Sequence, residues 1–135
     1  IEHICKPIFK NVYTSDINHT DNQFFNETDF LSINVDLRDE NVGMIDSEYI
    51  SKFQKEIYIV NTSRGEIINE LDILTLIDKD KIKGYATDVI QNEHSVENSI
   101  LLSTKNNKII ITPHVGGTAL ESQEKAYNRL IEKIN

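Results

Sequence analysis

The chain has 135 residues, of which 39% are hydrophobic and 27% are charged, and its formal net charge is −8. This length fits one domain with a buried core, and the acidic balance argues against nucleic acid or an anionic membrane as the main partner. Cys5 is the single cysteine, which excludes a disulfide framework and a cysteine-based zinc site and leads us to expect a reducing, cytoplasmic setting. No stretch predicts a transmembrane helix, and the first ten residues do not resemble a signal peptide.

Taken in chain order, the first 28 residues predict one short strand between less regular segments. Residues 1–10 have the pattern of a helix end that is broken near Pro7. Residues 11–14 are a strand candidate that ends at Ser15 and Asp16, and the polar residues 17–28 predict a loop.

From residue 30 onward, apolar runs rich in β-branched residues alternate with helical patterns. The predicted strands are 30–35, 57–60, 85–89 and 108–111, and the predicted helices are 46–53, 69–78, about 95–104 and 118–133. Asn69 is the expected N-cap of the second helix, whose apolar face would carry Leu71, Leu74 and Ile77. Strands that alternate with helices predict an α/β fold with a mostly parallel sheet.

Residues with reactive side chains stand where three of these strands end. Arg64 follows the strand 57–60, and His114 follows the strand 108–111. Asp88 lies at the end of the strand 85–89, and Glu93 comes shortly after it. Because ligands of open α/β sheets bind outside the carboxyl ends of the strands, these residues can converge on one small anionic substrate.

The pair of Glu93 and His114 is the most informative part of this set. A carboxylate partner fixes the tautomer of a histidine and stabilises its charged form, and such a pair is a common device for proton transfer. The alternative for His114 is a histidine held by a backbone carbonyl after a strand. The remaining histidines, His3, His19 and His94, have no comparable setting and are interpreted as surface residues.

The other candidates each have a simpler alternative. The guanidinium of Arg64 can grip a carboxylate with two hydrogen bonds, or it can be a surface arginine in a loop. The carboxylate of Asp88 can accept hydrogen bonds from a ligand amide, or it can cap local backbone N–H groups. Asp16 can bind ribose hydroxyls and repel a 2′-phosphate, or it can be a solvated turn residue.

An acidic loop at Asp36, Asp39 and Glu40 raises the question of a metal site. Its spacing matches no EF-hand, and no histidine or cysteine joins it. We therefore interpret this segment as a solvated loop and predict no metal.

Taken together, the segments NTSRG, DVIQNE and TPHVGG resemble, in that order, the D-isomer-specific 2-hydroxyacid dehydrogenases. The resemblance extends over about residues 11–130 and implies a Rossmann-like, doubly wound NAD-binding domain. It also implies that Arg64 binds the substrate carboxylate, that His114 is the general acid/base and that Glu93 is its partner. By the same resemblance, Asp88 contacts the nicotinamide carboxamide and Asp16 holds the adenosine ribose. Further residues that would line the cofactor are Val35, Asp36, Asn41, Thr62, Ser63, Gly116 and Gly117.

The reaction implied by the resemblance is hydride transfer between NAD and a D-2-hydroxy acid in a homodimeric enzyme. The family's first strand and its G-x-G-x-x-G turn would precede Ile1, and its substrate domain is absent from this sequence. We therefore expect residues 1–135 to be an N-terminally truncated, partial dinucleotide-binding domain that is inactive alone. Two alternatives are a non-catalytic Rossmann-fold relative that senses nucleotides or binds proteins, and a degenerate chain that binds no cofactor.

Overall fold

The computed structural model describes residues 11–15 and 22–134, which form a four-stranded sheet with helices between its strands. The helices and strands are, in order, α2 (Asn22–Glu27), β1 (Phe30–Ile33), α3 (Ser47–Ser51), β2 (Ile57–Asn61), α4 (Glu70–Asp78), β3 (Ile82–Thr87), α5 (Ile100–Ser103), β4 (Ile109–Ile111) and α6 (Leu120–Ile134). Short 3₁₀ helices occur at Asp39–Asn41, Gly65–Ile67 and Glu93–Asn98. None of the described helices is long and apolar enough to cross a membrane.

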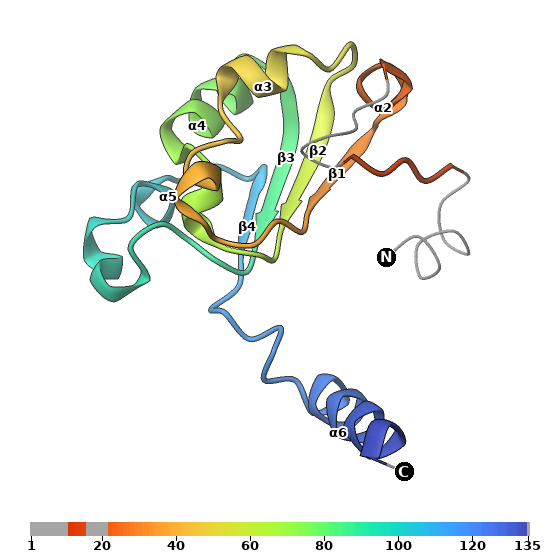
Figure 1. The fold of residues 1–135 in the computed structure, drawn as a ribbon. Helices are drawn as coiled ribbons and strands as arrows, with labels where there is room; N and C mark the ends of the chain where they lie inside the picture. Colours follow the sequence, from red (N-terminus) through yellow and green to blue (C-terminus); the bar gives the residue numbers. More distant parts are fainter. Residues whose placement is uncertain (1–10, 16–21, 135) are drawn as a thin grey trace.

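The strands lie in the order β1-β2-β3-β4, and every neighbouring pair is parallel. One row across the sheet joins the last residues of all four strands, because Ile33 pairs with Asn61, Asn61 with Thr87, and Thr87 with Ile111. All four strands therefore end at the same level, and the loops that follow them leave from one edge (Figure 1). The predicted α/β fold with a parallel sheet is confirmed.

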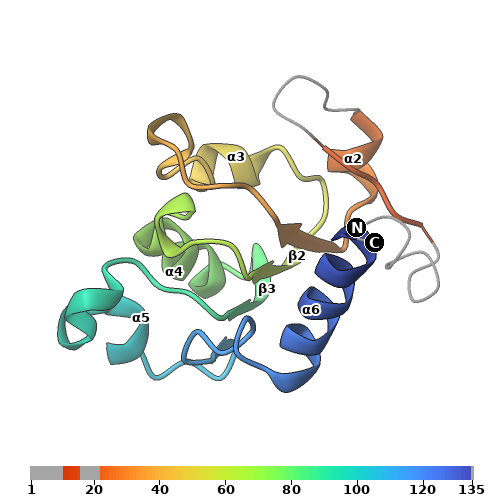
Figure 2. The ribbon, with the colours of Figure 1, turned by 60° about the horizontal axis from the view of Figure 1, so that its bottom comes forward.

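The hydrophobic core fills one face of the sheet. Helices α3, α4 and α5 lie on the same side of the sheet (Figure 1), and their residues Ile50, Ile73 and Leu101 are buried. Within the described residues, the opposite face remains open, since Tyr58 and Ile110 are 42% and 64% exposed there. Helix α6 stands apart from the α3–α5 layer beyond β4, as the turned view also shows (Figure 2).

The structure corrects the prediction for the amino-terminal part of the chain. Residues 11–15 form neither helix nor strand, because a strand requires a hydrogen-bonded neighbour and the described sheet offers them none. The predicted loop at 17–28 contains α2, whose Phe24 and Phe25 rings pack against Phe53 with centroids 5.6 and 5.1 Å away. Burial of these rings outweighs the polar composition of the segment. The helix end expected at 1–10 lies outside the described residues.

Helix α4 begins where the sequence predicts, and it buries part of the predicted face. Ile77 is buried and Leu74 packs against the core as expected, but Leu71 does not. The side chain of Asn69 caps the helix by accepting a hydrogen bond from the Asp72 N–H at 3.2 Å. Leu71 is 65% exposed, whereas Ile73 and Ile77 are fully buried. The buried face is therefore rotated away from Leu71, and the first helical residue, Glu70, is buried with it.

Candidate active site

The loop after β2 is built on Asn61, the last residue of the strand. Asn61 is fully buried, and its Oδ1 accepts hydrogen bonds from the backbone N–H and the hydroxyl of Ser63, both at 3.0 Å. Its Nδ2 donates to the carbonyl of Arg64 at 2.9 Å. The sequence interpretation did not single out this asparagine; an amide that ends an otherwise apolar strand was the available signal.

The side chain of Arg64 is exposed at the carboxyl edge of the sheet. Its Nη1 donates to the carbonyl of Ser63 at 2.6 Å. This is the hydrogen bond that the Arg64 side chain makes within the described part of the chain. A guanidinium has five N–H donors. The remaining donors suffice for a bidentate grip on a carboxylate.

Glu93 and His114 meet although 21 residues separate them, because they stand on the loops after the neighbouring strands β3 and β4. The His114 Nδ1 atom lies 2.8 Å from the Glu93 Oε2 atom. An ionised carboxylate can only accept hydrogen bonds, so this contact favours the neutral tautomer with the proton on Nδ1, in which Nε2 is the proton acceptor. The side chains are 48% and 36% exposed, so the pair remains accessible to a ligand.

The backbone is strained at His114 itself and at the residue before Glu93. His114 has a φ of 54°, and Asn92, the residue before Glu93, has the same value. Residues other than glycine seldom occupy this left-handed region, although asparagine and histidine are enriched in it. Such strain of about 1–3 kcal/mol per residue persists where the surrounding structure enforces it, often at functional sites.

Asp88 joins the loop after β3 to the loop after β4. Its Oδ1 accepts a hydrogen bond from the Val115 N–H at 3.0 Å, and its Oδ2 accepts one from the Gly116 N–H at 2.8 Å. The hydroxyl of Thr112 donates to Oδ1 as well. The Thr112 hydroxyl, followed by the two N–H groups and His114, lowers the pKa of Asp88. A carboxylate has about four acceptor positions, so acceptor capacity for one ligand donor remains.

Two glycines permit close approaches within the site. A Cβ atom at Gly65 would lie 2.0 Å from the Ile90 carbonyl carbon and 2.4 Å from the Gln91 nitrogen, so the loops after β2 and β3 touch there backbone to backbone. A Cβ atom at Gly116 would lie 3.0 Å from the Asp88 Oδ2 atom. Gly117 has open space around it, so the loop backbone beside His114 is free to approach a cofactor.

The residues predicted after β1 lie at the same edge, but their side chains interact with one another. Asn41 is 2% exposed, and its Nδ2 donates to the Asp36 carbonyl at 2.9 Å. The Asp36 carboxylate pairs with the Arg38 Nε at 2.7 Å, and Val35 packs against the core. Contact of Val35, Asp36 and Asn41 with a cofactor stays a prediction, as it does for Thr62 and Ser63. Asp16 lies outside the described residues.

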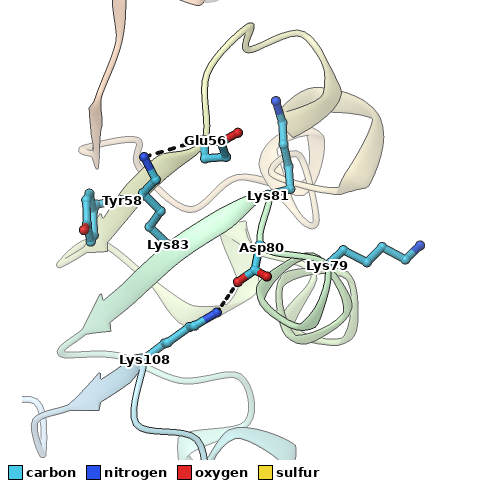
Figure 3. Close-up of a pocket in the computed structure, with 7 residues that line it drawn as sticks. All are labelled: Glu56, Tyr58, Lys79, Asp80, Lys81, Lys83 and Lys108. Carbon is cyan, nitrogen blue, oxygen red and sulfur yellow. Dashed lines mark hydrogen bonds and ion pairs between the residues drawn. The ribbon is translucent and has the colours of Figure 1, made fainter.

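A separate groove of about 520 Å³ lies at the opposite edge, where β2 and β3 begin (Figure 3). It is rich in lysine, but Lys83 pairs with Glu56 at 3.3 Å and Lys108 with Asp80 at 2.5 Å. Lys81 donates to the Phe53 carbonyl at 2.6 Å. Three of the four lysines thus have partners within the protein, and the fourth, Lys79, extends away from the others (Figure 3). The groove is therefore a weaker candidate for an anion site than the edge that carries Arg64.

Residues 10–116 match a family model described as the NAD-binding domain of D-isomer-specific 2-hydroxyacid dehydrogenases. A hydroxypyruvate reductase of Thermotoga maritima is 33% identical over 112 residues, which are 82% of this chain and 36% of the relative. The chain spans about a third of the length of the first curated relatives it matches.

Solved structures agree with this match. The D-lactate dehydrogenase of Aquifex aeolicus, complexed with NAD and lactic acid, is 24% identical, with a TM-score of 0.66 over 84% of this chain and 38% of that one. At this identity the likeness shows the fold. A relative from Rhizobium etli, solved with NADP, is 28% identical, with a TM-score of 0.61 over 69% of this chain and 30% of that one. Both nicotinamide cofactors are thus found among similar structures.

Proposed function

The chain belongs to the D-isomer-specific 2-hydroxyacid dehydrogenases, of which it carries the NAD-binding domain, and from this premise we propose that it forms part of an enzyme that interconverts a D-2-hydroxy acid and its 2-keto acid. The observation that carries the proposal is the hydrogen bond between His114 and Glu93 at the carboxyl edge of the sheet. A module that only bound a nucleotide would have no use for this pair at the same sheet edge as an exposed arginine.

His114 is the acid/base group in this proposal. Because its Nδ1–H donates to Glu93, its Nε2 is free to take the hydroxyl proton of the 2-hydroxy acid and to return it to the carbonyl oxygen in the reverse direction. Glu93 holds the imidazole in this tautomer and stabilises the imidazolium that forms. A bound nicotinamide would supply the redox chemistry, as donor or acceptor of the hydride at C2 of the substrate.

Arg64 orients the substrate through its carboxylate. Substitution of Arg64 by lysine replaces a bidentate grip by a point charge, and we expect kcat/KM for the 2-keto acid to fall about tenfold, as for the loss of one charged hydrogen bond. The KM for the nicotinamide cofactor should stay near its original value. An Arg64→Lys enzyme with unchanged substrate kinetics would contradict this role.

Two features of the loops after β3 and β4 support the binding of a nicotinamide cofactor. Asp88 has an acceptor position left for the nicotinamide carboxamide, and the backbone at Gly117 is unobstructed. We propose NAD rather than NADP, on the ground that Asp16 would bind the ribose hydroxyls and repel a 2′-phosphate. A homodimer is proposed from the family, and a cytoplasmic location from the single cysteine.

Residues 1–135 form, in this proposal, a partial dinucleotide-binding domain. A complete domain holds the pyrophosphate at a glycine-rich turn and a helix N-terminus, and this sequence contains no G-x-G-x-x-G segment. We therefore predict that the 135-residue chain alone binds NADH weakly or not at all and shows no turnover. Calorimetric titration with NADH tests this prediction, and micromolar binding would contradict it.

The proposed activity is tested by supplying the protein that contains this chain with NADH or NADPH and a series of 2-keto acids. Oxidation of NADH that depends on a 2-keto acid, with NADPH used less efficiently, is the expected result. Cofactor binding without turnover on any 2-keto acid would favour the non-catalytic nucleotide-binding relative instead.

A further inference from the structure

The loop that carries Glu93 is anchored on helix α4 by a buried carboxylate. Glu70, the first residue of α4, is 3% exposed, and its Oε1 accepts a hydrogen bond from the Gln91 N–H at 2.7 Å. The side chain of Gln91 reaches back in turn, and its Nε2 donates to the Ile68 carbonyl at 2.7 Å. Two hydrogen bonds thus fasten Gln91, two residues before Glu93, to the start of α4.

The burial of the Glu70 carboxylate has to be explained, because burying a charged group is unfavourable unless hydrogen-bond partners replace the lost water. Burial raises the pKa of Glu70, the hydrogen bond from the Gln91 N–H opposes that rise, and the nearby charge of Glu66 adds to it. An acidic residue in the first turn also suits the helix dipole. An exposed side chain would gain that benefit too, so the dipole does not account for the burial.

The segment between Gln91 and Glu93 leaves the glutamate little freedom. Gly65 lies against the Ile90–Gln91 peptide so closely that a Cβ atom would be 2.0 Å from the Ile90 carbonyl carbon. Asn92 has a left-handed backbone with a φ of 54°. The Glu93 Oε1 atom accepts a hydrogen bond from the Ile90 N–H at 3.3 Å, while its Oε2 atom faces His114 at 2.8 Å.

We propose that Glu70 is a positioning residue for the acid/base pair, because its bond to the Gln91 N–H fixes the turn that directs Glu93 onto His114. The inference rests on the proposed function for the role of His114. The series of contacts that links Glu70 to His114, by contrast, consists entirely of described residues. Glu70 touches neither of the reacting groups, and it acts through the backbone of Gln91 and Asn92.

Two substitutions at Glu70 separate its acceptor oxygen from its charge. Glu70→Gln keeps an oxygen that can accept from the Gln91 N–H, whereas Glu70→Ala removes it. Asp72→Ala is the matched control, because Asp72 lies in the same helical turn and accepts from the backbone N–H of Ser47, away from the site, at 2.8 Å. If Glu70→Ala does not fold, Glu70→Leu fills the space without offering an acceptor.

The first measurement uses the ¹⁵N chemical shifts of the His114 ring in the 135-residue chain, which report the nitrogen that carries the proton. The original chain, Glu70→Gln and Asp72→Ala should keep the proton on Nδ1, and Glu70→Ala or Glu70→Leu should give a mixture of tautomers. An unchanged tautomer in the variants without an acceptor, or an equal change in Glu70→Gln or Asp72→Ala, would overturn the proposal.

The second measurement is turnover in the protein that contains this chain. Displacing a catalytic group by about 1 Å can cost on the order of 100-fold, so kcat of Glu70→Ala should fall by up to that factor, with the KM for the cofactor unchanged. Glu70→Gln should keep kcat near that of the original protein. A fall in kcat equal to that of Glu70→Ala would overturn the proposal. If the original protein shows no turnover, the proposed function fails, while the tautomer measurement still decides the role of Glu70.

Discussion

At the scale of single residues, the site depends on positions where neighbouring atoms leave room for glycine but not for a side chain. Gly65 is the clearest case, because the neighbouring loop occupies the space in which a side chain would begin. The sequence shows Gly65 beside Arg64 and suggests a tight turn, but it does not show that the constraint comes from Ile90, 25 positions away. The constraint arises only in the folded chain, where β2 and β3 lie side by side and bring the loops after them together.

Substitution of Gly65 by alanine tests this contact. The added methyl group meets backbone atoms that cannot rotate away, so we expect the free energy of unfolding to fall by about 1–3 kcal/mol, as for an overpacked core. Gly117→Ala is the matched control, since nothing lies within 4 Å of its Cβ position. Urea unfolding measures both, and an equally stable Gly65→Ala chain would contradict the observed approach.

The lowered pKa of Asp88 predicts how the stability of the chain depends on pH. Its pKa in the folded chain lies below the ordinary value of 3.8, chiefly because the Thr112 hydroxyl donates to it. The folded state therefore holds the proton less tightly than the unfolded state, and the stabilisation is fully present above 3.8 and lost as the pH falls through the lowered pKa. Asp88→Asn should lower stability at neutral pH and flatten the acid side of the curve. Parallel acid curves for both proteins would contradict this.

At the scale of elements, the strand ends could be predicted to within two residues, since β1 ends at Ile33 rather than at 35 and β3 at Thr87 rather than at 89. The buried faces could be predicted only in part. An apolar β-branched run that stops at polar residues marks a strand and its loop, and this pattern places Arg64, Asp88 and His114 just after strands. The orientation of α4 could be predicted only in part, because leucine and isoleucine occur all around the helix. Leu74 and Ile77 face the core as expected, whereas Leu71 does not. Its contacts with β3 and α5, and the burial of Glu70, select the buried side.

A pair of substitutions on α4 tests the observed face. Ile73 is fully buried and Leu71 is 65% exposed. Ile73→Ala should cost about 2–5 kcal/mol of unfolding free energy, whereas Leu71→Ala should change it by no more than about 0.5 kcal/mol. Chemical unfolding of both variants gives the comparison, and a larger loss for Leu71→Ala than for Ile73→Ala would contradict the observed orientation of the helix.

Helix α2 shows why the amino-terminal part could not be predicted from the sequence. The segment NQFFNE is polar at both ends, and it forms a helix because its two rings join a cluster with Tyr49 and Phe53. The partners are more than 20 positions away, so local patterns carry no sign of them. Tertiary packing decides such short helices more than intrinsic propensity does.

At the scale of the whole molecule, the site results from the alignment of the four strand ends. The row from Ile33 to Ile111 brings the loops after all four strands to one edge. Residues separated by tens of positions therefore act together, and a chain with a net charge of −8 presents an exposed arginine and a histidine at that edge. Local placement, rather than overall charge, accounts for the proposed recognition of an anionic substrate.

The central claim is that His114, held by Glu93, moves the proton in the reaction, and His114→Gln tests it most directly in the protein that contains this chain. General acid/base catalysis contributes about 100- to 10,000-fold, so kcat should fall by such a factor while NADH binds as before. His94→Gln, which changes an exposed histidine next to Glu93, should leave turnover unchanged. A His114→Gln enzyme that keeps its turnover would contradict the account.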